Sequence, residues 1–116
     1  MAVRLRLTIL GCGSSPGTPR ITGDWGQCDP SNPRNRRRRA AAMVERISPE
    51  GITRIIIDTG PDFREQMIDA GVQRIDAVVY THPHADHIHG IDDLRSYVIE
   101  QRRLMDIYAD LPTLAR

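Results

Sequence analysis

The sequence lacks lysine, has only two cysteines in 116 residues and contains no long apolar run. A membrane-spanning helix needs roughly 20 consecutive apolar residues, so we predict no transmembrane segment and no membrane partner. The N-terminal residues alternate between polar and apolar types and show no signal-peptide cleavage pattern. Together these absences predict a cytoplasmic protein.

The two cysteines, Cys12 and Cys28, are too few for a disulfide scaffold, and we expect both to be reduced thiols. All sixteen basic residues are arginine, yet the net charge of +1 excludes a strong overall field that would recruit nucleic acid or membrane. An apolar fraction of 40% and a charged fraction of 27% are ordinary for a globular protein. The length fits one small domain, residues 1–116.

The first third of the chain predicts one strand followed by a long loop. Apolar residues alternate with polar ones over residues 3–9, which is the period of a half-buried strand. A glycine-rich segment follows at residues 11–17. Residues 18–39 contain several prolines and glycines and no periodicity, so we expect a loop of the functional or disordered kind.

The remainder predicts an α/β fold in which helices pack on a sheet. Turn residues between two apolar stretches indicate a hairpin, Pro61 favours a helix start, and Gly71 favours its end. The expected elements are hairpin strands over 41–47 and 52–58, a helix over about 61–70, a buried strand over 75–80, a helix over 92–103, a strand over 106–109 and a helix beginning near 111.

All four histidines fall within residues 82–89, directly after the predicted buried strand. His82 and His84 are two residues apart, so in extended backbone both side chains leave the same face and can reach one ion. Asp86 and His87 follow a turn and can reach a neighbouring ion; two ions roughly 3.5–4 Å apart can share one water. The alternatives are a polar loop whose histidines merely titrate and a structural zinc site, although the latter prefers cysteine.

The run Thr81-His82-Pro83-His84-Ala85-Asp86-His87 matches the T-H-x-H-x-D-H signature of the metallo-β-lactamase superfamily. The segment at residues 55–60, a strand ending in Asp and Gly, resembles the first motif of that superfamily. Segments 10–19, 58–64 and 87–95 resemble the branch that contains the phosphoribosyl cyclic phosphodiesterases, with the tRNA 3′-processing endonucleases as more distant relatives.

The resemblance implies an αββα sandwich with two divalent metal ions, zinc or manganese, at one edge. It implies that His82 and His84 bind the first ion and that Asp86 and His87 bind the second. Asp58 would brace the metal-binding loops by hydrogen bonds instead of binding directly, which is the usual way ligand orientation is fixed. His89 has no role in the signature, and we expect it at the surface or at a helix start.

Two features depart from these relatives. They often carry several cysteines in the first long loop, where they bind a separate structural zinc, and Cys28 alone stands there, so we expect no such zinc. The later metal ligands of the family have no counterpart after His89, so we expect the N-terminal half of the fold, completed in cis or by a second chain; a homodimer is a further arrangement. Residues 1–116 alone should then bind metal weakly, hydrolyse nothing appreciable and leave the apolar faces of strands 55–57 and 78–80 uncovered.

Residues 34–39 contain five arginines in six positions. Because a guanidinium group offers a planar fork to phosphate, Arg37 and Arg38 are candidates for phosphate binding. The alternative is a solvated basic stretch, which charge runs usually are. The run contains no aromatic residue for base stacking, so single-stranded nucleic acid is not the favoured partner.

The sequence therefore predicts a binuclear metal-dependent hydrolase, most consistent with a phosphodiesterase for a small nucleotide or ribose cyclic phosphodiester. Catalysis would use a metal-bridging hydroxide oriented by Asp86. Two alternatives remain open: an RNA-processing endonuclease, and a non-catalytic domain that binds a nucleotide or RNA through residues 34–39. Thiolester and β-lactam hydrolysis also remain open, because the same metals polarise a carbonyl.

Overall fold

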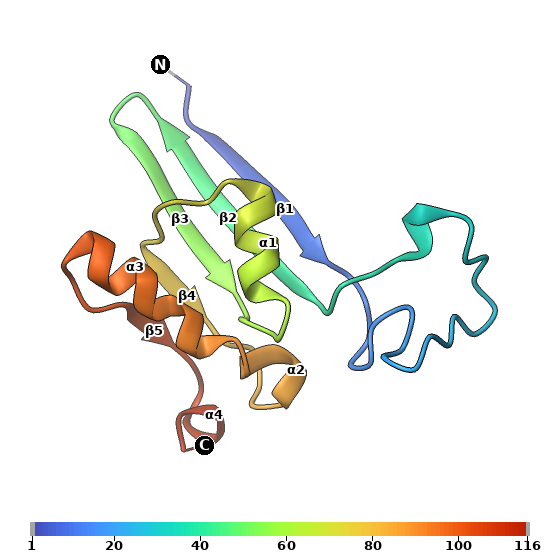
Figure 1. Ribbon diagram of the computed structural model, residues 1–116. Helices are drawn as coiled ribbons and strands as arrows, with labels where there is room; N and C mark the ends of the chain where they lie inside the picture. Colours follow the sequence, from blue (N-terminus) through green and yellow to red (C-terminus); the bar gives the residue numbers. More distant parts are fainter. Residues whose placement is uncertain (1, 116) are drawn as a thin grey trace.

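The computed structural model describes residues 2–115 and contains one five-stranded sheet with helices packed against it (Figure 1). The strands are β1 (Arg4–Gly11), β2 (Ala41–Ser48), β3 (Gly51–Ile57), β4 (Ala77–Val79) and β5 (Asp106–Tyr108). The helices are α1 (Phe63–Ala70), α2 (Ala85–Ile88), α3 (Leu94–Gln101) and α4 (Leu111–Leu114), with short 3-10 helices at Pro33–Asn35 and Ile91–Asp93.

The strand order is β1-β2-β3-β4-β5, and the connections explain where the helices lie. Strands β1, β2 and β3 are antiparallel neighbours, whereas β3, β4 and β5 run parallel. The two parallel connections step in the same direction across the sheet, and such crossovers are nearly always right-handed. Helices α1 and α3 therefore lie on the same face of the sheet (Figure 1).

The hydrophobic core lies between that face and the two helices. Ile56, Phe63, Ile75 and Val78 are fully buried. The core cluster comprises Met43, Ile56, Phe63, Met67, Val72, Ile75, Val78, Tyr80 and Leu94. Burial of these side chains is the main force that holds the helices to the sheet.

An ion triad replaces apolar packing near the hairpin end of the covered face. Glu45 of β2 is 1% exposed and lies opposite Arg6 of β1 and Arg54 of β3. Its two carboxylate oxygens each accept a hydrogen bond of 2.9 Å from one of these arginines. The bond from Arg6 lowers the pKa of Glu45 most, burial acts in the opposite direction, and Arg54 lowers it further. The apolar stretch predicted over residues 41–47 gave no sign of this triad.

The other face of the sheet is apolar and largely open. Leu5, Leu7 and Ile9 of β1 are 77%, 63% and 61% exposed, so the expectation that β1 is half buried was wrong. The apolar residues of strands 55–57 and 78–80 were expected to be uncovered. This is confirmed only for alternate residues, because Ile56, Val78 and Tyr80 face the core. The partly exposed members of the open face on the other strands are Ala42, Val44, Ile55, Ile57, Ala77, Val79 and Tyr108.

Most predicted elements are present, with small shifts at their ends. The hairpin and α1 are confirmed, whereas the predicted strand over 75–80 is shorter. The helix predicted over 92–103 opens as a 3-10 helix and ends at Gln101, before Arg102 in the left-handed region. The long loop is tied to itself by bridges from Gly13 to Arg39 and from Thr18 to Arg37. None of the helices described in residues 2–115 is long and apolar enough to cross a membrane.

Candidate metal centre

The histidine segment lies where the parallel strands β3 and β4 end. Asp58 follows β3 directly, His82 comes three residues after the end of β4, and α2 carries Asp86 and His87. The carboxyl ends of parallel strands meet at one edge of a sheet, which is the common place for a site in α/β folds. Figure 1 shows α2 beside this edge.

Backbone bonds and two glycines hold α2 tightly against the end of β3. The Thr59 amide donates to the carbonyl of His87 (2.9 Å), and the Gly90 amide donates to the carbonyl of Thr59 (2.8 Å). A Cβ atom at Gly60 would overlap the carbonyl oxygen of Asp86, and one at Gly90 would overlap the carbonyl oxygen of Gly60. Only glycine permits this close approach of two backbones.

Asp58 connects the end of β3 to the histidine segment. It adopts a left-handed conformation (φ 67°), which Asp tolerates better than most residues. Its Oδ1 accepts the Thr81 amide (2.8 Å), and its Oδ2 accepts the Thr81 hydroxyl (2.7 Å) and His87 Nδ1 (2.6 Å). Both carboxylate oxygens are therefore engaged.

These bonds define the tautomers of two histidines. A carboxylate only accepts, so His87 Nδ1 carries a proton and its Nε2 keeps a lone pair when the ring is neutral. Thr81 gives its single hydroxyl proton to Asp58, so His82 Nδ1, 2.9 Å away, donates to the Thr81 oxygen. Asp58 thus leaves Nε2 of both rings available as a ligand, once directly and once through Thr81.

The ligand types gather closely around these two rings. Asp58, His82 and His87 each present a ligand atom within 4.8 Å of the others. The ring of His82 lies 4.0 Å from that of His87 and 4.6 Å from that of His84, between centroids. Asp86 Oδ2 is 3.2 Å from His87 Nε2. Two acceptors at that distance repel each other unless a cation or a second proton lies between them, so the donor set fits a divalent metal ion.

The profile of the beta-lactamase superfamily domain matches residues 53–116, which include Asp58 and the whole histidine segment. The chain belongs to the metallo-β-lactamase superfamily. The resemblance found in the sequence is thereby confirmed, as is the α/β fold class of the metallo-β-lactamase type.

Two solved structures are similar to this chain. A new diphosphatase from the PhnP family aligns with a TM-score of 0.82 and 43% identity over 97% of this chain and 44% of its own. Zn²⁺-bound PqqB from Methylobacterium extorquens aligns with a TM-score of 0.68 and 23% identity over 94% of this chain and 38% of its own, which shows the fold alone. The chain therefore spans less than half of each.

A curated octanoyltransferase from Porphyromonas gingivalis is 38% identical over 106 residues. The match covers 91% of this chain but only 20% of that protein. The name describes a protein of which four fifths have no counterpart in the match, so it does not suggest acyl transfer for this superfamily member.

A buried pair of hydroxyl groups next to Asp58 was not predicted from the sequence. Thr59 Oγ1 and the Tyr80 hydroxyl lie 2.6 Å apart, and both residues are buried. Burial raises the pKa of Tyr80, the bond to Thr59 acts against this, and the Asp58 carboxylate raises the pKa further. The phenol is therefore a neutral group that joins the ends of β3 and β4. The only signal in the sequence was a polar atom at the end of each strand.

The two candidate phosphate-binding arginines contact groups of the loop and of α1. Arg37 Nη1 contacts Cys12 Sγ at 3.1 Å, and Arg38 Nη2 pairs with Asp69 of α1 at 2.6 Å. His89 follows α2 and is exposed, as expected. The roles of Arg37 and Arg38 in phosphate binding, and of the two cysteines in avoiding metal, stay predictions.

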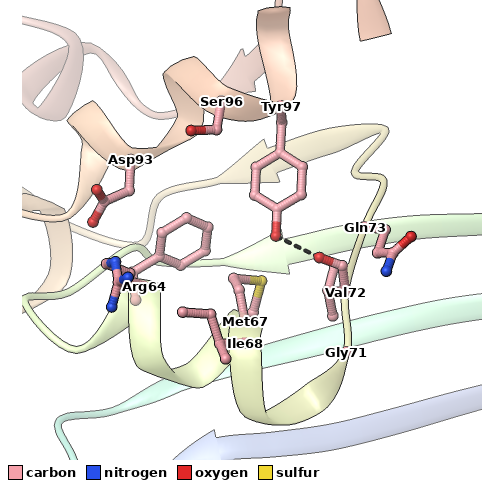
Figure 2. Close-up of a pocket in the computed structure, with 10 residues that line it drawn as sticks. Arg64, Met67, Ile68, Gly71, Val72, Gln73, Asp93, Ser96 and Tyr97 are labelled. Carbon is pink, nitrogen blue, oxygen red and sulfur yellow. Dashed lines mark hydrogen bonds between the residues drawn. The ribbon is translucent and has the colours of Figure 1, made fainter. Parts of the chain in front are cut away.

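A groove of about 430 Å³ between α1 and α3 is separate from the metal centre (Figure 2). Its wall includes Met67 and Tyr97, and the Tyr97 hydroxyl donates to the Val72 carbonyl (2.7 Å). No histidine lines it. The groove lies where the two helices pack against each other.

Proposed function

We propose that this chain carries the metal-binding part of a binuclear hydrolase that cleaves a phosphodiester in a small nucleotide or ribose substrate. The observation that carries the proposal is the chain of bonds from Asp58 to His87 and, through Thr81, to His82. A buried carboxylate that orients two imidazoles serves little purpose in a solvated polar loop, whereas it is the usual support of a metal ligand.

We assign His82 and His84 to one ion and Asp86 with His87 to the other, zinc or manganese. Asp58 is not a ligand in this proposal, because both of its oxygens already accept hydrogen bonds. The two cations, when bound, supply positive charge that makes water a good nucleophile near neutral pH and neutralises the phosphate oxygens.

The residues of the chain keep this site ready before substrate arrives. Asp58 and Thr81 hold the imidazole rings in one tautomer and one orientation, so no reorganisation is needed when the cations bind. Asp86 orients the attacking water with its carboxylate. The group that protonates the leaving oxygen is not among the residues of this segment in our proposal.

Diphosphate hydrolysis is a second candidate, favoured by the 43% identity to a diphosphatase. Its chemistry places similar demands on the site, because charge again builds on phosphate oxygens in line with a departing oxygen. The relative rates on an aryl phosphodiester, a cyclic nucleotide and a nucleoside diphosphate separate the two candidates. An RNA-processing activity would instead appear with precursor tRNA.

The test is a pair of substitutions in the same segment of the intact protein. Asp86→Ala should reduce turnover of an aryl phosphodiester to background with zinc or manganese added, because it removes both a ligand and the group that orients water. His89→Ala is the matched control, since this exposed histidine lies three residues away, and it should keep full activity. Undiminished turnover in Asp86→Ala would refute the two-metal proposal, and no turnover in the parent protein would favour a non-catalytic role.

A further inference from the structure

The loop over residues 12–39 holds its arginine run in a defined conformation. The Thr18 amide donates to the Arg37 carbonyl (3.1 Å), and the Arg37 amide donates to the Thr18 carbonyl (2.8 Å). The Gly13 amide donates to the Arg38 carbonyl (2.7 Å). The run is therefore the C-terminal segment of an ordered loop and not a solvated tail.

A cleft of about 420 Å³ lies between this run, the turn at residues 17–23 and the start of α1. Five arginines line it, Arg20, Arg36, Arg37, Arg38 and Arg39, and so do two carboxylate residues, Asp62 and Glu65. A second cleft of about 440 Å³, lined by residues 9–12 and by Arg34, shares three of these arginines. Both clefts open along the same run.

The positive charge of these clefts is only partly neutralised. Arg38 pairs with Asp69 (2.6 Å), and Arg39 pairs with Asp62 (3.0 Å). Within residues 2–115, by contrast, Arg20, Arg34 and Arg36 have no carboxylate within 4.0 Å in an ion pair, and the contact recorded for Arg37 is with a thiol. Guanidinium groups packed in this way repel one another, and an anion between them removes that repulsion.

The arginine run ends beside the metal centre. A Cβ atom at Gly60 would lie 3.9 Å from Arg39 Cβ, and the same atom would overlap the carbonyl oxygen of Asp86. Gly60 therefore lies between the end of the run and the segment that carries Asp86. From there the run leads away from the sheet edge (Figure 1). An anion held by the arginines would thus lie near the metal ligands but not among them.

We propose that residues 34–39, together with Arg20, form a second anion site that binds a distal phosphate group of the substrate. The ligand class is an organic phosphate with at least two phosphate groups, one at the metal centre and one at the arginines. The inference rests on the proposed function for the first of these groups, but the binding of the second depends only on the loop. The planar fork of arginine suits phosphate oxygens in both clefts.

The binding test uses the intact protein freed of metal by a chelator, with tripolyphosphate and inorganic phosphate as probes in calorimetry. Arg20→Gln combined with Arg36→Gln should weaken tripolyphosphate binding by about tenfold or more, because each substitution removes a charge-assisted bond. The matched control is Arg64→Gln combined with Arg95→Gln, two exposed arginines outside the loop that pair with neighbouring acids. It should change binding less than about twofold.

Equal weakening in both double variants would overturn the inference, since the effect would then reflect overall charge. Unchanged binding in the loop variant would overturn it as well.

A kinetic test then asks whether the two sites serve one substrate. The loop variant should raise KM for a phosphodiester that carries an additional phosphate monoester and leave kcat/KM for a simple aryl phosphodiester unchanged. If the KM for the phosphorylated substrate is the same in the loop variant as in the parent, the arginines do not contact substrate. If neither substrate is hydrolysed by the parent protein, the proposed function fails, while the binding test still decides the anion site.

Discussion

The two faces of the central sheet carry similar apolar residues but have different surroundings. On one face, Ile56 and Val78 are fully buried beneath α1 and α3. On the other, Leu7 and Ile9 remain more than half exposed. The residue types do not explain the difference, since all four are large and aliphatic.

The difference follows from the hand of the connections. Both parallel crossovers place their helices on the same side, so the opposite side receives no helix from them. An open apolar surface that extends across several strands is unusual for a monomer and marks a place where something packs. The αββα architecture of the superfamily leads us to expect a second sheet there in the intact protein.

The largest effect should come from a substitution beneath the helices. Phe63→Ala should lower the free energy of unfolding of residues 1–116 by about 3–5 kcal/mol, because it leaves a cavity in the core. Leu7→Ala should lower it by less than about 1 kcal/mol, since its side chain is already exposed. Urea unfolding of both variants measures the contrast.

The same pair in the intact protein tests what covers the open face. If a second layer packs there, Leu7→Ala should cost about 2–5 kcal/mol, as truncation of a buried leucine usually does. A cost as small as in residues 1–116 would contradict the expected cover.

An intermediate effect should come from the ion triad on the covered face. The folded pKa of Glu45 lies below its unfolded value, so its contribution to stability is present above about pH 4.3 and is lost as the pH falls through the folded pKa. Glu45→Gln should therefore make unfolding free energy less dependent on pH below about 4.5, while destabilising the protein at neutral pH by up to about 3 kcal/mol.

Denaturant unfolding between pH 3 and pH 7 measures this dependence. Glu65→Gln, at an exposed position of α1, is the control and should leave the profile unchanged. Parallel profiles for Glu45→Gln and the parent would mean that the triad stores no such pH-dependent stability.

A smaller effect is expected at Asp58, at the end of β3, where the substitution should change zinc affinity. Asp58→Asn should weaken zinc binding by the intact protein about 10- to 100-fold, because the variant no longer fixes the tautomer of His87. Competition with a chromogenic chelator measures the affinity. Asp92→Asn, an exposed position paired with Arg95, should bind zinc as the parent does. Complete loss of one zinc equivalent would instead identify Asp58 as a direct ligand.

Local patterns were enough to predict most elements and the segment that forms the candidate metal centre. The spacing of His82, His84 and His87 is a property of a few adjacent residues, and so is the turn chemistry between β2 and β3. Such signals need no information about distant parts of the chain. The ends of the elements differ from the predicted ends by a few residues, because tertiary packing influences where an element ends and local patterns carry no information about that packing.

The sequence by itself thus determined the spacing of the histidines and the carboxylate that we propose as ligands, and the α/β order of elements. Only the tertiary structure decided that the apolar residues of β1 face the open side, that Glu45 lies between Arg6 and Arg54, and that Asp58 controls two histidine tautomers through Thr81. Each of these depends on strand register or on the hand of a crossover, which join residues distant in the chain. Alternation within one strand gives two faces but cannot say which one a helix will cover.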